Sequence, residues 1–280
     1  MTPAQLEGKT VVASVSGGKD SAALSLYLTR IGIEHRRVFA DTGWEHPDTY
    51  AYLRGSLIDK LGPIDEVRSP AGGMREWAIK KGMFPSRIRR WCTTELKMRP
   101  IRDYIRRLQD DGHEVVNAVG IRRGESKARE MSLEREWSDF YDCDVWRPMV
   151  DWTEEQVIAE IRGADLAPNP LYLRGQTMVG CWPCIFARKS EIAALSDKDV
   201  AKIATIEDDV SRASESRGTG RRGFFQARWP VPGAGGKYPV IPIAEAVAWA
   251  RKPSRGKRQL EMFADDDRPC VRWGLCEASR

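Results

Sequence analysis

The 280-residue sequence has no long apolar run and only three histidines, and these two features argue against a membrane-spanning protein and a histidine-based hydrolase. No window approaches the roughly 18 consecutive apolar residues that a membrane-spanning helix needs, so none is expected. Residues 1–10 (MTPAQLEGKT) lack the basic and apolar regions of a signal peptide, which predicts a cytoplasmic protein. The only histidines are His35, His46 and His113, so a Ser-His-Asp triad has little support.

The composition is that of a globular enzyme. Hydrophobic residues make up 41% of the chain and charged residues 30%, which is enough to bury one sizeable core. The chain has six cysteines. In a cytoplasmic protein they are better explained as metal ligands or reactive thiols than as structural disulfides, because the cytosol keeps thiols reduced.

Short β-rich segments alternate with helical patterns along the first part of the chain. Alternation of this kind predicts an α/β fold with a doubly wound, mostly parallel sheet and helices on both faces. The β-rich segments are residues 10–16, 37–40, 64–67 and 115–119. The helical patterns cover residues 21–31, 48–61, 97–111 and 153–162, with Gly32 after the first, Pro100 early in the third, and a Thr153–Gln156 capping box opening the last.

The composition changes beyond about residue 190. A helical stretch over residues 196–214 is followed by Gly- and Pro-rich sequence at 218–220 and 230–242. We therefore predict a nucleotide-binding domain over residues 1–190 and a helical, loop-rich extension over residues 191–280. The extension contains a basic segment and a cysteine-containing tail.

The most informative motif is residues 16–21 (SGGKDS), between the first β-rich segment and the first helix. Two glycines let backbone N–H groups turn toward an anion, and the helix N-terminus adds partial positive charge. Side chains of Ser16, Lys19 and Ser21 can add donors. The spacing is not that of a Walker A loop, but it predicts a phosphate site.

The hexapeptide resembles the pyrophosphate loop, SGGxDS, of the adenine nucleotide α-hydrolase superfamily. Three further segments are similar to the phosphoadenylylsulfate reductase branch: residues 39–47 (FADTGWEHP), 90–100 (RWCTTELKMRP) and 119–129 (VGIRRGESKAR). The motifs 169–172 (NPLY) and 180–184 (GCWPC) continue the pattern. The resemblance spans roughly residues 10 to 190.

The resemblance implies a binding site for ATP with Mg²⁺. In that site residues Ser16, Gly17, Gly18, Lys19, Asp20 and Ser21 would hold the phosphates. Asp41 and Thr42 would hold the adenosine end. Lys19 and Asp20 are candidate catalytic residues, and Arg122 and Arg129 are candidates to stabilise charge on the transferring phosphoryl group.

The cysteine set of this chain includes a CxxC pair, and related enzymes often hold a [4Fe–4S] cluster at such positions. The expected ligands are Cys92, Cys181, Cys184 and one tail cysteine, Cys276 rather than Cys270. A tetrahedral zinc site, a CxxC redox pair and buried apolar thiols are the alternatives. Cys143 is not an expected ligand, because its acidic neighbours raise the pKa of a thiol.

Two departures from the reductase pattern favour an ATP-using thiolase. The phosphate loop is complete, and the tail reads GLCE over residues 274–277 instead of the reductases' Glu-Cys-Gly-Leu-His. The chain therefore looks closer to iron–sulfur thiolases such as those of DNA phosphorothioation and tRNA thiolation. Sulfur would arrive as a persulfide, from a donor such as a cysteine desulfurase, or as sulfide on an open cluster iron. The alternatives are a sulfonucleotide reductase and a non-catalytic module that binds nucleotide or nucleic acid.

The positive charges are clustered, although the net charge is only +5. Arg87, Arg89 and Arg90 precede Cys92, and four more arginines follow at positions 99, 102, 106 and 107. The segment 251–258 contains no acid. Such clusters favour a polyanionic acceptor such as DNA or tRNA. A solvated helix face or a flexible basic linker explains the 251–258 segment equally well.

Overall fold

The computed structural model describes residues 1, 3–226, 240–252 and 273, and its centre is a six-stranded sheet. The strand order is β3-β2-β1-β4-β6-β5, and every neighbouring pair is parallel except β5 with β6. The strands are β1 (Thr10–Ser14), β2 (His35–Asp41), β3 (Asp65–Arg68), β4 (Val115–Ala118), β5 (Arg135–Ser138) and β6 (Cys143–Trp146). The predicted α/β sheet is therefore confirmed. The sequence pattern does not predict β5, because this edge strand exposes most of its side chains and so lacks an apolar alternation.

The strand order reverses between β1 and β4. From β1 the chain moves outward through β2 to β3, then returns to the other side of β1 to form β4. The connections at the carboxyl ends of β1 and β4 therefore diverge, and a crevice forms where such loops separate. The segments that leave these two ends are residues 15–18 and 119–122, which include the start of the predicted phosphate loop.

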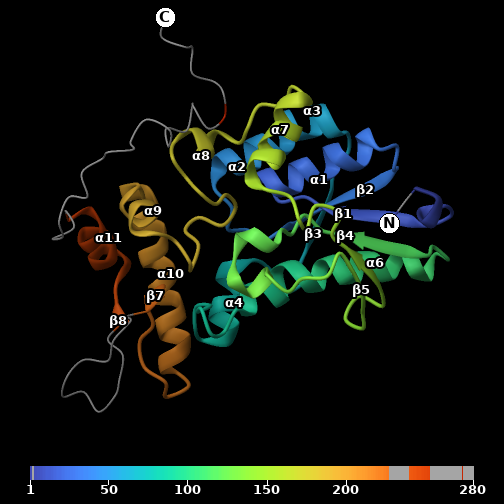
Figure 1. Ribbon diagram of the computed structural model, residues 1–280. Coiled ribbons are helices and arrows are strands. Elements are labelled where there is room, and N and C mark those ends of the chain that lie inside the picture. The colour runs from blue at the N-terminus through green and yellow to red at the C-terminus, as the bar shows by residue number, and fades with distance from the viewer. Residues whose placement is uncertain (2, 227–239, 253–272, 274–280) are drawn as a thin grey trace, which may run out of the picture.

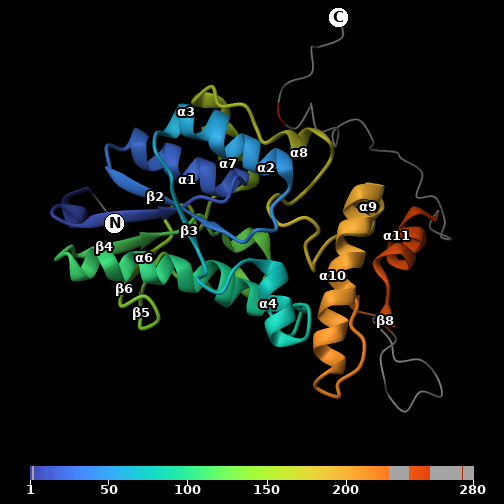
Figure 2. The ribbon, with the colours of Figure 1, turned by 180° about the vertical axis from the view of Figure 1, so that it is seen from behind.

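Helices cover both faces of the sheet (Figures 1 and 2). One face carries α1 (Lys19–Arg30), α7 (Glu154–Gly163) and a continuous helix made of α2 (Pro47–Tyr52), the π-turn η2 (Leu53–Leu57) and α3 (Ile58–Leu61). The other face carries α6 (Arg99–Asp110), which continues from α5 (Trp91–Thr93) through the π-turn η3 (Thr94–Met98). The four predicted helices are present. The third begins at Trp91, six residues before its predicted start at Lys97, so Cys92 lies within its first turn.

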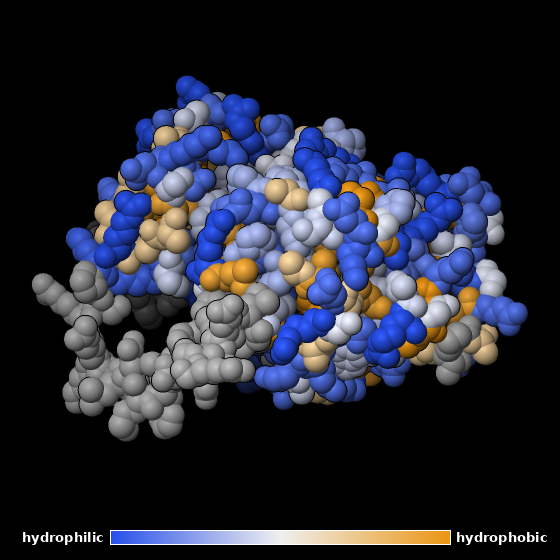
Figure 3. Space-filling model, turned by 90° about the horizontal axis from the view of Figure 1, so that it is seen from above, coloured by the Kyte–Doolittle hydropathy of each residue, from blue (hydrophilic) through white to orange (hydrophobic). Residues whose placement is uncertain are grey.

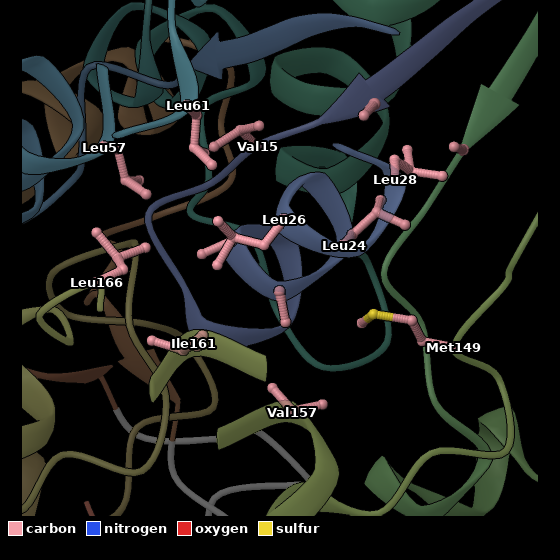
Figure 4. Packing of buried hydrophobic residues seen from close by; sticks show 14 of the residues in the cluster. Val15, Leu24, Leu26, Leu28, Leu57, Leu61, Met149, Val157, Ile161 and Leu166 are labelled. Carbon is pink, nitrogen blue, oxygen red and sulfur yellow. The ribbon is translucent and has the colours of Figure 1, made fainter. Parts of the chain in front are cut away.

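The core between the sheet and α1 is built from aliphatic side chains. Leu24 and Leu28 of α1 are fully buried, as are Leu57 of η2 and Val157 of α7. Figure 4 shows these side chains directed into a common space with Met149. Local signals agree with this packing: Gly32 has a φ of 75° just after α1, and the Thr153–Gln156 capping box opens α7. The predicted ranges of α1 and α7 therefore agree with the structure, which also shows that these two helices contact each other.

The C-terminal helices form a second packing centre beside the sheet. Helices α9 (Lys189–Ala193), α10 (Asp197–Glu215) and α11 (Ile243–Arg251) stand together in both ribbon views (Figures 1 and 2). They share one buried cluster with α4 (Met74–Lys81), so the described residues of the C-terminal extension pack into a core that they share with the first domain. Helix α10 agrees with its predicted range, whereas α11 begins just after the Gly- and Pro-rich stretch and corresponds to no predicted helix. The remaining elements are η1 (Pro3–Leu6), η4 (Arg123–Glu125), η5 (Lys127–Arg129), α8 (Pro170–Leu173), β7 (Phe225–Gln226) and β8 (Val240–Ile241).

The surface carries no broad apolar area on the face seen in Figure 3, where hydrophobic residues lie in small separate patches. Among the described residues, no helix is long and apolar enough to cross a membrane. Residues 253–258 of the basic segment 251–258, residues 230–239 of the Gly- and Pro-rich stretch 230–242, and Cys270 and Cys276 lie outside the described residues.

A buried carboxylate joins the C-terminal segments to α10. The Glu207 Oε1 atom accepts a hydrogen bond from the Phe224 N–H at 2.7 Å, and its Oε2 atom accepts one from the Ile243 N–H at 3.0 Å. Glu207 is 6% exposed, so water does not replace these partners easily. The side chain therefore fixes the start of α11 against α10.

We expect Glu207→Ala to lower the free energy of unfolding by about 2–4 kcal/mol, because it leaves two buried N–H groups without an acceptor. Urea unfolding followed by circular dichroism measures the change. The control is Glu215→Ala, an exposed glutamate on the same helix, which should change stability by no more than about 0.5 kcal/mol. Equal unfolding midpoints for both variants would contradict the role given to Glu207.

Candidate functional site

The loop of residues 16–21 is closed by its own side chains. The Ser16 N–H donates to the Ser21 Oγ atom at 3.0 Å, and the Ser21 hydroxyl donates to the Gly18 carbonyl at 3.0 Å. Gly17 has a φ of 75°, and a Cβ atom there would lie 2.8 Å from Thr49 Cγ2. Gly18, the N-cap of α1, supplies no side-chain cap to the first turn. The loop thus combines a fixed backbone with a helix N-terminus that no side chain of the loop itself caps, and this arrangement favours phosphate binding.

Residues from α8 and its N-cap hold this loop from outside. The Lys19 N–H donates to the Tyr172 hydroxyl oxygen at 3.0 Å, and the Lys19 ammonium lies 5.2 Å from the centre of the Tyr172 ring. The Asn169 side-chain amide donates to the Gly17 carbonyl at 3.1 Å. The sequence alone indicates no role for Tyr172 and Asn169, although the NPLY motif of residues 169–172 contains both. The structure therefore adds two residues that position the phosphate loop.

The charged side chains of the loop are paired. Lys19 Nζ lies 3.2 Å from Glu154 Oε1 and 3.6 Å from Asp20 Oδ2. Arg122, which is 6% exposed, donates from its Nε to Asp20 Oδ1 at 2.5 Å. The structure thus brings Lys19, Asp20 and Arg122 together at the crevice between β1 and β4.

Arg129 is placed less directly. Its guanidinium pairs with Glu125, whose carboxylate also accepts a hydrogen bond from the Arg122 N–H at 2.8 Å. Arg129 is therefore joined to the loop through Glu125 and Arg122, and its side chain is 41% exposed. Among the four candidate catalytic residues it lies at the rim of the site.

Asp41 and Thr42 hold the turn after β2. The Asp41 carboxylate accepts hydrogen bonds from the Tyr50 hydroxyl at 2.6 Å and the Gly43 N–H at 2.8 Å, and it pairs with Arg68. Burial alone would raise the pKa of Asp41, but these donors outweigh it and lower the pKa below its usual value. The Thr42 hydroxyl donates to Glu45 Oε1 at 2.9 Å. Both side chains are thus engaged within the protein, and their contact with adenosine stays a prediction.

The CxxC segment is paired along the chain that follows this turn. The His46 N–H donates to the Gly180 carbonyl at 3.1 Å, and the Trp182 N–H donates to the Trp44 carbonyl at 2.8 Å. Between them, Glu45 and Cys181 form an antiparallel β-bridge. The pairing places the segment containing Cys181 and Cys184 against the carboxyl end of β2.

Three thiols share one electrostatic partner, the Lys97 ammonium. Cys181 is the largest cause that raises the pKa of Lys97, and Cys184 and Cys92 raise it further. Burial raises the pKa of Cys181 to about 12 and also raises that of Cys92 and Cys184. The thiols are therefore protonated near neutral pH, and binding a metal there would release their protons.

Glu45 lies close to the three thiols, whereas the fourth described cysteine, Cys143, does not. Glu45 interacts electrostatically with Lys97, and its Oε2 atom is buried with no hydrogen-bond partner among the described residues. Cys143 lies in the core between the sheet and α6, where burial and then its acidic neighbours raise its pKa to about 11.

Among the residues described, no group of three or more His, Cys, Asp or Glu side chains is arranged to hold a metal ion.

Comparison with known proteins adds a family model and several relatives. The model described as the phosphoadenosine phosphosulfate reductase domain matches residues 10–187. An uncharacterized protein of Escherichia phage 186 is 31% identical over 95% of this chain and 96% of its own. An uncharacterized protein of Methanocaldococcus jannaschii is 28% identical over 77% of this chain and 51% of its own, so this chain spans about half of that relative.

Proteins with a named activity match a smaller part of the chain. An adenosine 5′-phosphosulfate reductase of Allochromatium vinosum is 31% identical over 62% of this chain and 68% of its own. The crystal structure of a phosphoadenylyl-sulfate reductase from Candida auris, in complex with phosphate, is 19% identical with a TM-score of 0.49. That match covers 62% of this chain and 82% of the other.

Gly120 lies so close to the phosphate loop that a methyl group has no room. A Cβ atom there would lie 2.7 Å from the Asp20 backbone oxygen, which cannot move without displacing the start of α1. The sequence predicts that this loop binds ATP, so we expect Gly120→Ala to weaken that binding by about tenfold, since overpacking costs about 1–3 kcal/mol. Isothermal titration calorimetry measures the change.

The matched control is Gly124→Ala in the same connection, where an added Cβ atom meets nothing within 4 Å. It should bind ATP as the unchanged protein does. If both alanine variants bind ATP equally well, the close approach at Gly120 does not shape the nucleotide site.

Proposed function

Because the chain belongs to the phosphoadenosine phosphosulfate reductase domain family, we propose that it is an ATP-dependent sulfur-transfer enzyme that uses a [4Fe–4S] cluster. In this proposal the enzyme adenylates an acceptor, releases pyrophosphate and then exchanges AMP for sulfur. The observation that carries it is the complete phosphate loop, which Tyr172, Asn169 and Arg122 hold in place at the strand-order reversal.

The side chains at the crevice suit the first step. The loop N–H groups and Lys19 would bind the β and γ phosphates, with Lys19 exchanging its contact with Glu154 for one with phosphate. The carboxylates of Asp20 and Glu154 are oxygen ligands of the kind that Mg²⁺ prefers. Arg122 would stabilise charge that builds on the α-phosphoryl group, and Arg129 would add to this from the rim.

The proposed reaction has two steps, adenylation of the acceptor and replacement of AMP by sulfur. An acceptor oxygen attacks the α-phosphorus of ATP, and the bond from that phosphorus to pyrophosphate breaks, so pyrophosphate leaves and the acceptor becomes adenylated. A sulfide ion, released from a persulfide donor such as a cysteine desulfurase by a thiol reductant, then attacks the acceptor carbon or phosphorus atom. The new bond to sulfur forms as the bond to AMP breaks, so AMP leaves with the oxygen.

The thiols fit an iron–sulfur cluster in kind. Cys92, Cys181 and Cys184 all interact electrostatically with Lys97, and a nearby cation lowers the cost of forming the thiolates that bind iron. The fourth expected ligand, Cys276, lies outside the described residues. When bound, a cluster would supply an iron site that carries sulfur for transfer.

We expect protein purified without oxygen to be brown and to contain about four irons per chain. Cys181→Ala should abolish the colour and the iron, because it removes a buried ligand. Cys143→Ala is the control and should keep both, since that thiol lies in a different cluster of the core. Iron quantification and visible absorption measure the outcome, and stoichiometric zinc without iron would exclude the cluster.

Supplied with ATP, Mg²⁺ and a persulfide source, the protein should release AMP and pyrophosphate only when its acceptor is present. Lys19→Ala should lower pyrophosphate release by about 100-fold or more, because it removes a cation from the phosphates. Lys60→Ala, an exposed lysine on α3, should not change it. Sulfite formed from phosphoadenylylsulfate faster than any ATP-dependent reaction would instead establish a sulfonucleotide reductase.

A further inference from the structure

Residues 86–90, which we call the arginine loop, carry three exposed cations without acidic partners. Arg87, Arg89 and Arg90 are exposed, and no carboxylate of the described residues forms an ion pair with any of them. The two arginines of the crevice differ, since Arg122 and Arg129 are both paired. The arginine loop therefore concentrates positive charge that no carboxylate of the described part of the chain pairs with, and such charge attracts anions.

An apolar side chain projects from the middle of this loop. Ile88 is 94% exposed, more than any other large hydrophobic residue among those described. Exposing an isoleucine fully to water between three arginines brings no gain in folding. Three arginines around an exposed isoleucine suit a ligand that has both charged and apolar parts. A nucleic acid has both, because its phosphates are charged and its sugars and bases offer apolar surface.

A cavity of about 480 Å³ opens behind the arginine loop. Its lining residues are Lys81, Met83, Arg89, Arg90, Trp91 and Thr94, which include three cations and no acid. Trp91 is 9% exposed, and its indole Nε1 atom is buried with no hydrogen-bond partner among the described residues. A ligand that enters this cavity therefore meets three cations and the Trp91 side chain.

Phe186 joins the arginine loop to the thiols. The guanidinium groups of Arg87 and Arg90 lie 5.5 Å and 5.1 Å from the centre of the Phe186 ring. The Phe186 N–H donates to Cys184 Sγ at 3.4 Å. Arg90 is also two residues from Cys92. A strand bound along the arginine loop therefore lies next to the thiol group.

We propose that the arginine loop and the cavity behind it bind the sugar–phosphate backbone of a nucleic acid, and that this nucleic acid is the acceptor of the sulfur-transfer reaction. The assignment rests on the proposed function and gives the acceptor its chemical class. A nucleic acid fits because its phosphates repeat, whereas a single nucleotide would leave the other arginines unpaired. Its sugars and bases also offer apolar surface to Ile88.

The experiment measures binding of the full-length protein to a fluorescein-labelled DNA duplex and to a labelled tRNA, by anisotropy between about 50 and 200 mM salt. Arg87→Ala/Arg89→Ala should weaken binding about tenfold or more at the lower salt. It should also reduce the slope of log affinity against log salt by about 1 for each phosphate that the variant no longer neutralises. Ile88→Ser should weaken binding without changing this slope.

The charge-matched control is Lys60→Ala/Arg162→Ala, which removes two exposed cations from α3 and α7. It should keep the affinity within about twofold. Equal weakening by both double variants would mean attraction to the whole basic surface and would overturn the assignment, as would unchanged binding by the arginine-loop variant.

Pyrophosphate release separates this assignment from the proposed function. Arginine-loop-dependent binding by a protein that never releases pyrophosphate from ATP would support the nucleic-acid surface and refute the enzyme reaction. Acceptor-dependent pyrophosphate release with equal nucleic-acid binding by Arg87→Ala/Arg89→Ala and the unchanged protein would overturn the assignment alone.

Discussion

The close approach of the β4 connection to the start of α1 is the constraint on which the crevice depends. Gly120 has no side chain, so the chain leaving β4 can lie against the Asp20 backbone. That approach puts Arg122 at hydrogen-bond distance from the Asp20 carboxylate and places a buried cation beside the phosphate loop. The reversal of strand order brings these two connections to one edge of the sheet, and the absence of a Cβ atom lets them touch.

The turn after β2 joins the phosphate loop to the thiols. Asp41 holds the turn through Tyr50 and Arg68, and the Thr42 carbonyl accepts a hydrogen bond from the Met74 N–H at the start of α4. A few residues later the same chain pairs with the CxxC segment. One buried segment therefore sets the position of the thiols relative to the sheet. In this segment the Asp41 carboxylate is hydrogen-bonded, whereas Glu45 Oε2 is buried with no hydrogen-bond partner among the described residues and Glu45 interacts electrostatically with Lys97.

The cations beside the phosphate loop and those of the arginine loop have different physical roles. Lys19 and Arg122 are buried and paired with carboxylates, so their positions are fixed before any nucleotide binds. The arginines of the arginine loop are exposed and unpaired with acids among the described residues, so they attract anions over longer distances and depend on salt. The first arrangement suits precise contact with a triphosphate, and the second suits capture of a larger polyanion.

The sequence by itself determined the α/β fold, the glycine-rich turn between β1 and α1 and the positions of most helices, because glycine geometry, apolar periodicity and capping are local properties. It also grouped Cys92 with the CxxC pair as expected ligands of one cluster. The contacts of Tyr172, Asn169 and Glu154 with the loop were decided only by the tertiary structure, as was the position of Lys97 among the thiols. These contacts join residues far apart in the chain. No periodicity or capping rule encodes such pairs, because their distances are set by how α7, α8 and the CxxC segment pack on the sheet.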